Sequence, residues 1–485
     1  MKSKRYFRFL INFFIMEAGF SSVAITPNLE DRDEPLRLGG FLPREYCTGV
    51  HDDLYVRGVY IEGNREDVET HILMLIADVI GIDKNLGIAV KRLIAQQLPI
   101  PVKNIMISAT HTHHGPDFRG TFKVGGPLAI IQGFLFPEPQ SSELINFGRK
   151  IIRCAKNAYN NKIKVSMGVK QGFIDESKRI MINRRAPFQP NKAQYPVSVI
   201  KFCYNEGDHE GDLYGAVVNY AVHGTVLPRY NTEITADYVG YLVKHLESKY
   251  PGCEGNFAYF NGPCGEINPL TSELADKMRK AGAMDGLTND DIYDQRGTWE
   301  DAQRIGETIA ETAISLIKSA ECRISGTTKV KTWDKTINIP IKDYNYGSDF
   351  SQAFSRILFK IKKAAFLTLA RIGVLKSSIL LSADRLKDKV IEAYIQVIDL
   401  DGCIIYTIPG EFFLKLGNEI MEHSKKLIPT KKTFLIELAN NSIGYLYTID
   451  AFVEGGYESE FSMTPMAGRY LTMKIKKLIR RLSTS

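Results

Sequence analysis

Three histidines after a short apolar segment are the residues best suited to do chemistry in this sequence. Residues 104–110 are mostly apolar and predict a buried strand, which Gly115 and Pro116 would end. Because side chains alternate along a strand, His111 and His113 are expected to face one pocket at its carboxyl end, where open α/β sheets hold ligands. Neutral imidazole binds zinc, copper, iron or nickel. The alternative is that these histidines only hydrogen-bond backbone carbonyls at a loop entrance.

Further candidate ligands stand at the ends of other predicted strands. The strand 213–222 ends in His223 followed by a glycine, which repeats the first pattern. Glu411 follows a Pro-Gly pair after the strand region 389–408, where it could be a metal ligand or a carboxylate at a helix N-terminus. Arg184 is next to a second arginine, and a solvated surface pair is the default interpretation. None of these local spacings identifies a metal by itself.

Strand and helix patterns alternate along the chain and must position these residues. Strands are expected at 18–27, 54–62, 71–83, 104–111, 163–172, 196–204, 213–222, 256–260, 326–340, 389–408 and 433–438. Helices are expected at 84–98, 140–160, 236–250, 299–320, 351–383, 412–426 and from 467 onward, with a long polar loop before 299. We find no internal repeat, so the simplest fold is one α/β domain, a mixed sheet-based catalytic domain with helical insertions.

The sequence divides into three regions. Residues 18–466 form the predicted catalytic domain, with 351–389 as a basic, apolar helical insertion. Residues 467–485 form a basic C-terminal helix, and residues 1–17 a basic and apolar N-terminal segment. That segment resembles a minimal signal peptide but lacks an Ala-x-Ala-like cleavage site. We therefore expect an uncleaved amino terminus and a cytoplasmic protein.

The composition is that of a soluble enzyme with one large or two ordinary domains. Of the 485 residues, 44% are hydrophobic and 24% are charged, and no apolar run approaches the roughly 18 residues that a membrane span needs. The seven cysteines are scattered and include no Cys-x-x-Cys pair, which argues against a disulfide framework or a zinc ribbon. Nucleotide-binding and serine-hydrolase motifs are lacking, and the basic tracts are aliphatic, so no nucleic acid partner is expected.

The order of several motifs resembles the neutral/alkaline (non-lysosomal) ceramidase family over most of residues 18–465. The matching segments are Ala-Ile-Thr-Pro at 24–27, Thr-His-Thr-His at 110–113, Asn-Arg at 183–184, Tyr-Ala-Val-His at 220–223, Gly-Glu-x-x-Pro at 265–269, Pro-Gly-Glu at 409–411 and the turn at 440–445. The resemblance implies one zinc ion per chain, held by His111, His223, Glu411 and Tyr445. It also implies that His113 and Arg184 are active-site residues. Tyr447 is the alternative to Tyr445.

The sequence also departs from the family pattern. The family serine that has been assigned a catalytic role falls on Asn268, which cannot be a nucleophile but could orient water or substrate through its amide. His114 and Asp117 replace small residues and would make the pocket narrower and more polar. We expect no carboxy-terminal β-sandwich domain of the kind that the family usually has. Because the family is often secreted, export is the alternative to a cytoplasmic location.

These features predict a zinc-dependent amide hydrolase that cleaves an N-acyl bond in a lipid or an acylated amino sugar. A zinc site with an open position activates water and polarises an amide carbonyl. His113 would act as general acid or base, or support the ligands, and Arg184 would hold the carbonyl oxygen or a polar head group. The alternatives are a non-catalytic zinc-containing ligand-binding protein of the same fold and a zinc esterase or phosphodiesterase.

Two basic stretches predict contact with a membrane surface. Apolar and basic residues mix along 356–389, as they do in cationic amphipathic helices at membrane interfaces, and 469–481 adds further positive charge. The alternative is a core-packed helix with a solvated basic face.

Overall fold

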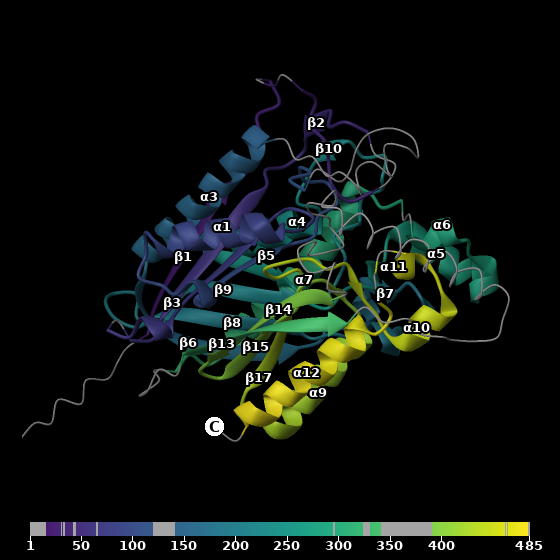
Figure 1. Cartoon of the computed structure of the whole chain (residues 1–485). Coiled ribbons are helices and arrows are strands. Elements are labelled where there is room, and N and C mark those ends of the chain that lie inside the picture. The colour runs from purple at the N-terminus through teal and green to yellow at the C-terminus, as the bar shows by residue number, and fades with distance from the viewer. Residues whose placement is uncertain are drawn as a thin grey trace, which may run out of the picture.

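An eight-stranded mixed sheet forms the centre of the molecule (Figure 1). The computed structural model describes residues 16–30, 32, 34–41, 45–64, 66–119, 141–293, 296–323, 330–340, 390–460, 462 and 464–483. The strand order is β11-β9-β8-β6-β1-β3-β4-β5. The strands are β1 (Glu17–Ala24), β3 (Tyr55–Glu62), β4 (His71–Ala77), β5 (Ile105–Ala109), β6 (Ile163–Gly172), β8 (Val197–Tyr204), β9 (Leu213–Tyr220) and β11 (Phe257–Asn261). The β4-β5 and β9-β11 pairs are parallel and the others antiparallel, which confirms the mixed α/β class.

The sheet consists of two halves that are joined where β1 pairs with β6 through Glu17 and Ala18. An apolar cluster contains side chains from both halves, among them Met74 of β4 and Phe260 of β11. On its other face, the β3-β4-β5 half packs against α1 (Lys84–Ala95) and α3 (Ser141–Asn160). The β8-β9-β11 half packs in the same way against α4 (Tyr238–Lys249) and α7 (Trp299–Ser319). Both faces of these strands are therefore buried, which explains their nearly continuous apolar sequences.

A second, four-stranded sheet has the order β13-β14-β15-β17. Its strands are β13 (Lys331–Pro340), β14 (Val390–Leu400), β15 (Cys403–Thr407) and β17 (Lys432–Ile436). Side chains such as Ile405 and Phe434 join the cluster between the halves of the large sheet. The other face packs against α9 (Leu414–Leu427) and α12 (Ala467–Leu482), which lie side by side in Figure 1.

The C-terminal helix α12 uses its apolar face for packing. Leu471, Ile475 and Ile479 of this helix are all buried in the cluster with α9. This favours the core-packed alternative for 469–481, whereas the predicted insertion at 351–389 and its membrane-contact tract lie outside the described residues. None of the helices in the described part of the chain is both long and apolar enough to cross a membrane.

Several short elements were not predicted from the sequence. Paired strands of two or three residues are β2 (Gly49–Val50) with β10 (Glu233–Ile234), β7 (Met181–Asn183) with β12 (Ile267–Pro269), and β16 (Glu411–Phe412) with β18 (Tyr445–Leu446). Short helices are α5 (Ser272–Ala281), α6 (Asn289–Tyr293), α10 (Ile449–Glu454) and α11 (Tyr457–Glu460), and 3₁₀ turns lie at Val68–Thr70, Val102–Asn104, Glu176–Lys178, Pro190–Ala193 and Met284–Gly286. The predicted long polar loop before 299 is thus partly helical. In α5, Thr271 caps the N-terminus. Only Leu274 and Met278 of this helix are buried, so its apolar face is too short to stand out in a sequence rich in charged residues.

One cross-link was also not predicted. Cys203 of β8 forms a disulfide with Cys322, which follows α7. The expectation of no disulfide framework therefore missed one bond, because 119 residues separate the two cysteines and only the packing of α7 on β8 brings them together.

Candidate metal centre

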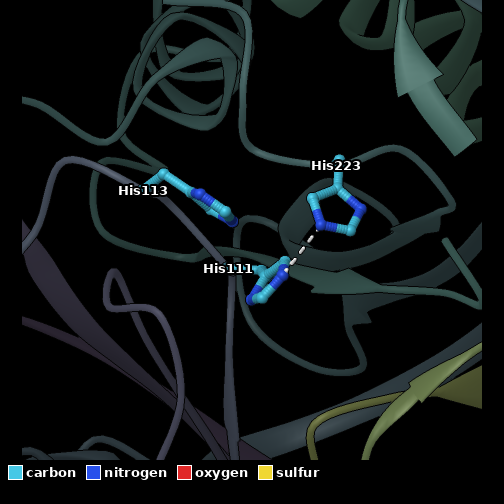
Figure 2. A group of neighbouring side chains, drawn as sticks. All are labelled: His111, His113 and His223. Atoms are coloured by element: carbon cyan, nitrogen blue, oxygen red, sulfur yellow. Dashed lines mark hydrogen bonds between the residues drawn. The ribbon is translucent and has the colours of Figure 1, made fainter. Parts of the chain in front are cut away.

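Three buried histidines converge in the space shown in Figure 2. His111 follows β5 and His223 follows β9, and their Nε2 atoms lie 3.0 Å apart. A ligand nitrogen of His113 completes the group, in which all three nitrogens lie within 4.8 Å of one another. The two segments meet in a bridge between Thr112 and Gly224. A Cβ atom on Gly224 would lie 2.5 Å from the His111 carbonyl oxygen, so only glycine permits this approach.

The sequence predicted that His111 continues the strand, but in the structure it does not. β5 ends at Ala109, and the His111 backbone has a φ of 69°, in the left-handed region. Its N–H donates to the carbonyl of Val79 at 3.1 Å, and its Nδ1 lies 2.8 Å from the carbonyl oxygen of Ile80. Strand alternation is therefore not the reason that His111 and His113 share a pocket, although their ring centroids do lie 4.9 Å apart.

The hydrogen bonds at the outer nitrogens prepare both histidines to bind a cation. His111 Nδ1 faces the Ile80 carbonyl and His223 Nδ1 lies 2.9 Å from the Cys264 carbonyl oxygen. A carbonyl only accepts, so each Nδ1 carries a proton, and a ring without a second proton presents its Nε2 lone pair to the space between the two rings. Burial, together with the neighbouring His111 and Arg184, lowers the pKa of His223 to about 3, which keeps that ring neutral. Two facing lone pairs are repulsive unless a cation lies between them, and nitrogens bound to one tetrahedral zinc ion lie about 3.3 Å apart.

Glu411 adds a negative charge to the same space. Its Oε2 lies 3.4 Å from His111 Nε2 and 3.5 Å from His223 Nε2. Although burial opposes ionisation, His111, His223 and a hydrogen bond from Tyr445 lower the pKa of Glu411 to about 2. A buried carboxylate and two imidazole lone pairs are a suitable donor set for zinc.

Glu411 is not the carboxylate at the N-terminus of the following helix. It lies in β16, and α9 begins at Leu414. The backbone N–H of Leu414 donates instead to Oε2 of Glu266, at 2.9 Å. The helix-capping alternative for Glu411 is therefore wrong, and Glu266 has that role.

The short pair β16-β18 distinguishes the two candidate tyrosines. Tyr445 is the register partner of Glu411 in this parallel pair, and its ring centroid lies 5.5 Å from the guanidinium carbon of Arg184. The ring of Tyr447 instead stacks parallel to that of Phe452, with the ring centroids 6.3 Å apart. The register therefore places Tyr445, and not Tyr447, beside the proposed ligands.

Removing the two tyrosine hydroxyls one at a time should give different results. We expect Tyr445→Phe to weaken zinc binding by at least about tenfold, because it removes a donor beside Glu411. Tyr447→Phe is the matched control and should bind zinc like the wild type. Equilibrium dialysis against zinc would measure both affinities, and the reverse order would assign the fourth position to Tyr447.

Arg184 and Asn268 lie together on the paired strands next to this centre. Arg184 follows β7, and Asn268 is part of β12. The Arg184 guanidinium donates from Nε to Glu458 at 2.8 Å, from Nη1 to Asn268 Oδ1 at 3.1 Å and from Nη2 to the Gly265 carbonyl at 2.6 Å. Arg184 is buried, so the interpretation as a surface charge is wrong.

Gly265 connects this arginine to the metal centre. A Cβ atom at Gly265 would lie 2.8 Å from the carbonyl oxygen of Glu411, so the two backbones are in close contact. The amide of Asn268 is occupied on both sides, since its Nδ2 also donates to the carbonyl of Ile292 at 2.9 Å. Arg184 and Asn268 are thus bonded to each other beside the backbone that contacts Glu411.

Two buried carboxylates near this centre were not predicted from the sequence. Glu437 follows β17 and is 0% exposed, and Glu458 in α11 is 1% exposed. Glu437 did leave a signal, because it interrupts the apolar run 434–439 and acidic residues are almost never fully buried unless they are paired. Glu458 left none, because its neighbours in sequence are polar.

Known proteins match the chain in sequence. Residues 38–345 match the family model described as neutral/alkaline non-lysosomal ceramidase, N-terminal. Neutral ceramidase of Drosophila pseudoobscura pseudoobscura is 26% identical over 366 residues, which cover 66% of this chain and 47% of that protein. Neutral ceramidase A of Dictyostelium discoideum is 26% identical over 276 residues, 50% of this chain and 36% of that protein. The chain thus spans about half the length of these curated relatives, or less.

The fold has a counterpart among solved structures. The crystal structure of neutral ceramidase from Pseudomonas aeruginosa matches with a TM-score of 0.70 and 16% sequence identity, covering 97% of this chain and 75% of that chain. This likeness concerns the fold alone. The family resemblance seen in the motifs is confirmed by the family model, which matches more than half of the residues. The chain therefore belongs to the neutral/alkaline non-lysosomal ceramidase family.

Proposed function

We propose that the chain is a zinc-dependent amide hydrolase that cleaves the N-acyl bond of a lipid of the ceramide type. The observation that carries the proposal is the pair of Nε2 atoms of His111 and His223, 3.0 Å apart, with Glu411 Oε2 within 3.5 Å of both. The relatives named neutral ceramidase support the substrate class. When bound, a zinc ion supplies Lewis acidity, which favours ionisation of water near neutral pH and polarises an amide carbonyl.

The surrounding residues have separate roles in metal binding and proton transfer. His111, His223 and Glu411 hold the metal, and Tyr445 is the fourth donor. His113 has its ring centroid 4.9 Å from that of His111 and 5.5 Å from that of His223, so a ring nitrogen can accept a proton from water beside the ligands and return it to the leaving amine.

Arg184 is better suited to positioning than to substrate binding. Its donors are directed to Glu458, Asn268 and the Gly265 carbonyl, so they are used within the protein. We therefore assign Arg184 to holding Gly265 and Tyr445 in place around Glu411, with Asn268 as its acceptor.

An N-acylated amino sugar is the alternative substrate. It rests on the polar residues His114 and Asp117, which the family pattern lacks. Both are buried and bonded to protein: His114 Nε2 lies 3.2 Å from the Pro228 carbonyl oxygen, and Asp117 accepts from the backbone N–H of Arg119 at 3.2 Å. These contacts favour a structural role for the two residues, and so the lipid substrate.

Metal analysis and a substrate comparison test the proposal together. The purified protein should contain one zinc ion per chain and should hydrolyse a short-chain ceramide faster than an N-acetylamino sugar. A chelator should abolish this activity and added zinc should restore it. Zinc binding without amidase activity would instead favour a ligand-binding protein, and hydrolysis of phosphodiesters or esters alone would favour the other zinc hydrolases.

Asn268→Ser tests whether a serine nucleophile is needed. We expect ceramide turnover within about tenfold of the wild type, because a serine hydroxyl can also accept a hydrogen bond from Arg184. Zinc content should not change. An increase of more than about a hundredfold, the size of a nucleophilic or acid-base contribution, would mean that the wild type lacks its nucleophile.

A further inference from the structure

Glu437 is a buried carboxylate at which the segments that carry the proposed ligands meet. Its Oε2 accepts from the backbone N–H of Phe412 at 2.9 Å and from that of Cys264 at 3.1 Å. The Cys264 thiol lies 2.9 Å from Oε1. Burial raises the pKa of this carboxyl well above its ordinary value, although the hydrogen bonds from Cys264 and Phe412 oppose that shift. Oε2 can accept both N–H groups in either protonation state, so its structural role does not depend on titration.

Each bonded segment leads directly to one ligand. The Cys264 carbonyl is the acceptor for His223 Nδ1, at 2.9 Å. Phe412 is the residue after Glu411 in β16. The backbone carbonyl of Glu437 accepts from the hydroxyl of Ser108, at 2.9 Å, in the strand that precedes His111. One residue is thus bonded to the segments that carry His111, His223 and Glu411.

The separation of these segments in sequence makes the arrangement hard to replace. Ser108 lies in β5, Cys264 in the turn that follows β11, and Phe412 in β16. Glu437 Oε2 accepts the N–H groups of both Cys264 and Phe412, and so it fixes these two segments relative to each other. Buried N–H groups without an acceptor are costly, so removing that oxygen would force one segment or both to move.

We infer that Glu437 is a positioning residue that sets the metal geometry by holding the backbones next to His223 and Glu411. The inference rests on the proposed function and adds a residue that does not touch metal or substrate. Partners of this kind typically change metal affinity by about 10–100-fold when they are lost.

The test compares two substitutions of similar size. Glu437→Met removes both acceptor oxygens and should weaken zinc binding by about 10–100-fold. Glu437→Gln keeps one oxygen for the two N–H groups and should bind zinc within about threefold of the wild type. Zinc affinity is measured by competition with a chelator, and the absorption spectrum of the Co²⁺-substituted protein reports ligand geometry. The spectrum should change for the methionine variant and not for the glutamine variant.

Glu62→Met is the matched control, because it removes a buried carboxylate of β3 that is hydrogen-bonded to Tyr60 and to Lys162, the residue before β6. It should leave zinc affinity and the Co²⁺ spectrum unchanged. Wild-type affinity and spectrum in Glu437→Met would overturn the inference. Equal losses in the glutamine and methionine variants would also overturn it, because the N–H acceptor would then not be the cause.

A second measurement does not need the metal. Amide hydrogen exchange at Cys264 and Phe412 should become at least about tenfold faster in Glu437→Met than in the wild type, with smaller changes elsewhere. If the wild type bound no metal, the proposed function would fail, and exchange at these two amides would still decide whether Glu437 holds them. Unchanged exchange at both would refute the positioning role.

Discussion

Replacing His111 or His223 with alanine is expected to remove zinc from the protein and to abolish amide hydrolysis. Each substitution deletes one of the two Nε2 atoms that face each other at 3.0 Å. The remaining ring and Glu411 would form an incomplete donor set. Because the metal contributes several kcal/mol of transition-state stabilisation, kcat/KM should fall by at least about a thousandfold. Elemental analysis of the purified variants and ceramide turnover measure the two effects.

His71→Ala is the control for losing a buried histidine. His71 is 2% exposed and hydrogen-bonded to the carbonyl oxygens of Pro99 and Asn64, outside the group of three histidines. This variant should keep one zinc ion per chain and its activity at a temperature where it is folded. Full zinc content in both His111→Ala and His223→Ala would refute the proposed ligand set.

Arg184→Lys is expected to lower kcat/KM by about a hundredfold while zinc content is retained, because small misplacements of active-site groups have effects of this size. Arg184 reaches Glu458, Asn268 and the Gly265 carbonyl from different nitrogens of one planar group. A lysine ammonium cannot reproduce this fork. Arg184→Met should in addition destabilise the fold by about 3–5 kcal/mol, since it leaves a buried carboxylate without this partner.

Arg185 offers a matched control, since it pairs with the same Glu458 at 3.0 Å and also with Glu454. Arg185→Met should reduce the free energy of unfolding but leave kcat/KM close to the wild type at a temperature where the variant is folded. Urea unfolding and ceramide kinetics on both variants separate the two contributions. Equal kinetic losses at the two positions would show that Glu458, rather than the contacts to Asn268 and Gly265, explains the effect.

Much of the scaffold could be predicted from local patterns. Apolar runs of five to eight residues identified β3, β5, β9 and β11, and the period of apolar residues identified α1, α3, α4 and α7. These elements have strong local signals because their buried faces are long. β16 and β18 have only two residues each and α5 buries only Leu274 and Met278, which is too few for a period to be visible.

The sequence by itself determined which residue types stand at strand ends: His111, His223 and Glu411 each follow an apolar strand, and the ordered motifs identified the family. Only the tertiary structure decided how they meet. His111 and His223 are 112 residues apart and belong to different halves of the sheet, so their distance depends on the way the halves pack. The His111 backbone is left-handed, its N–H donates to the Val79 carbonyl and its ring Nδ1 contacts the Ile80 carbonyl, which no alternation rule could show.

The same limit applies to the residues around the ligands. The sequence left Tyr445 and Tyr447 as alternatives, and the parallel register of β16 with β18 places Tyr445 next to Glu411. Glu437 was visible only as an acid in an apolar run, and its contacts to Cys264 and Phe412 depend on β17 lying beside two distant segments. Strand and helix patterns arise from neighbours in sequence, whereas these contacts arise from packing between segments that are far apart in the chain, so the positions of the supporting residues could be decided by the fold alone.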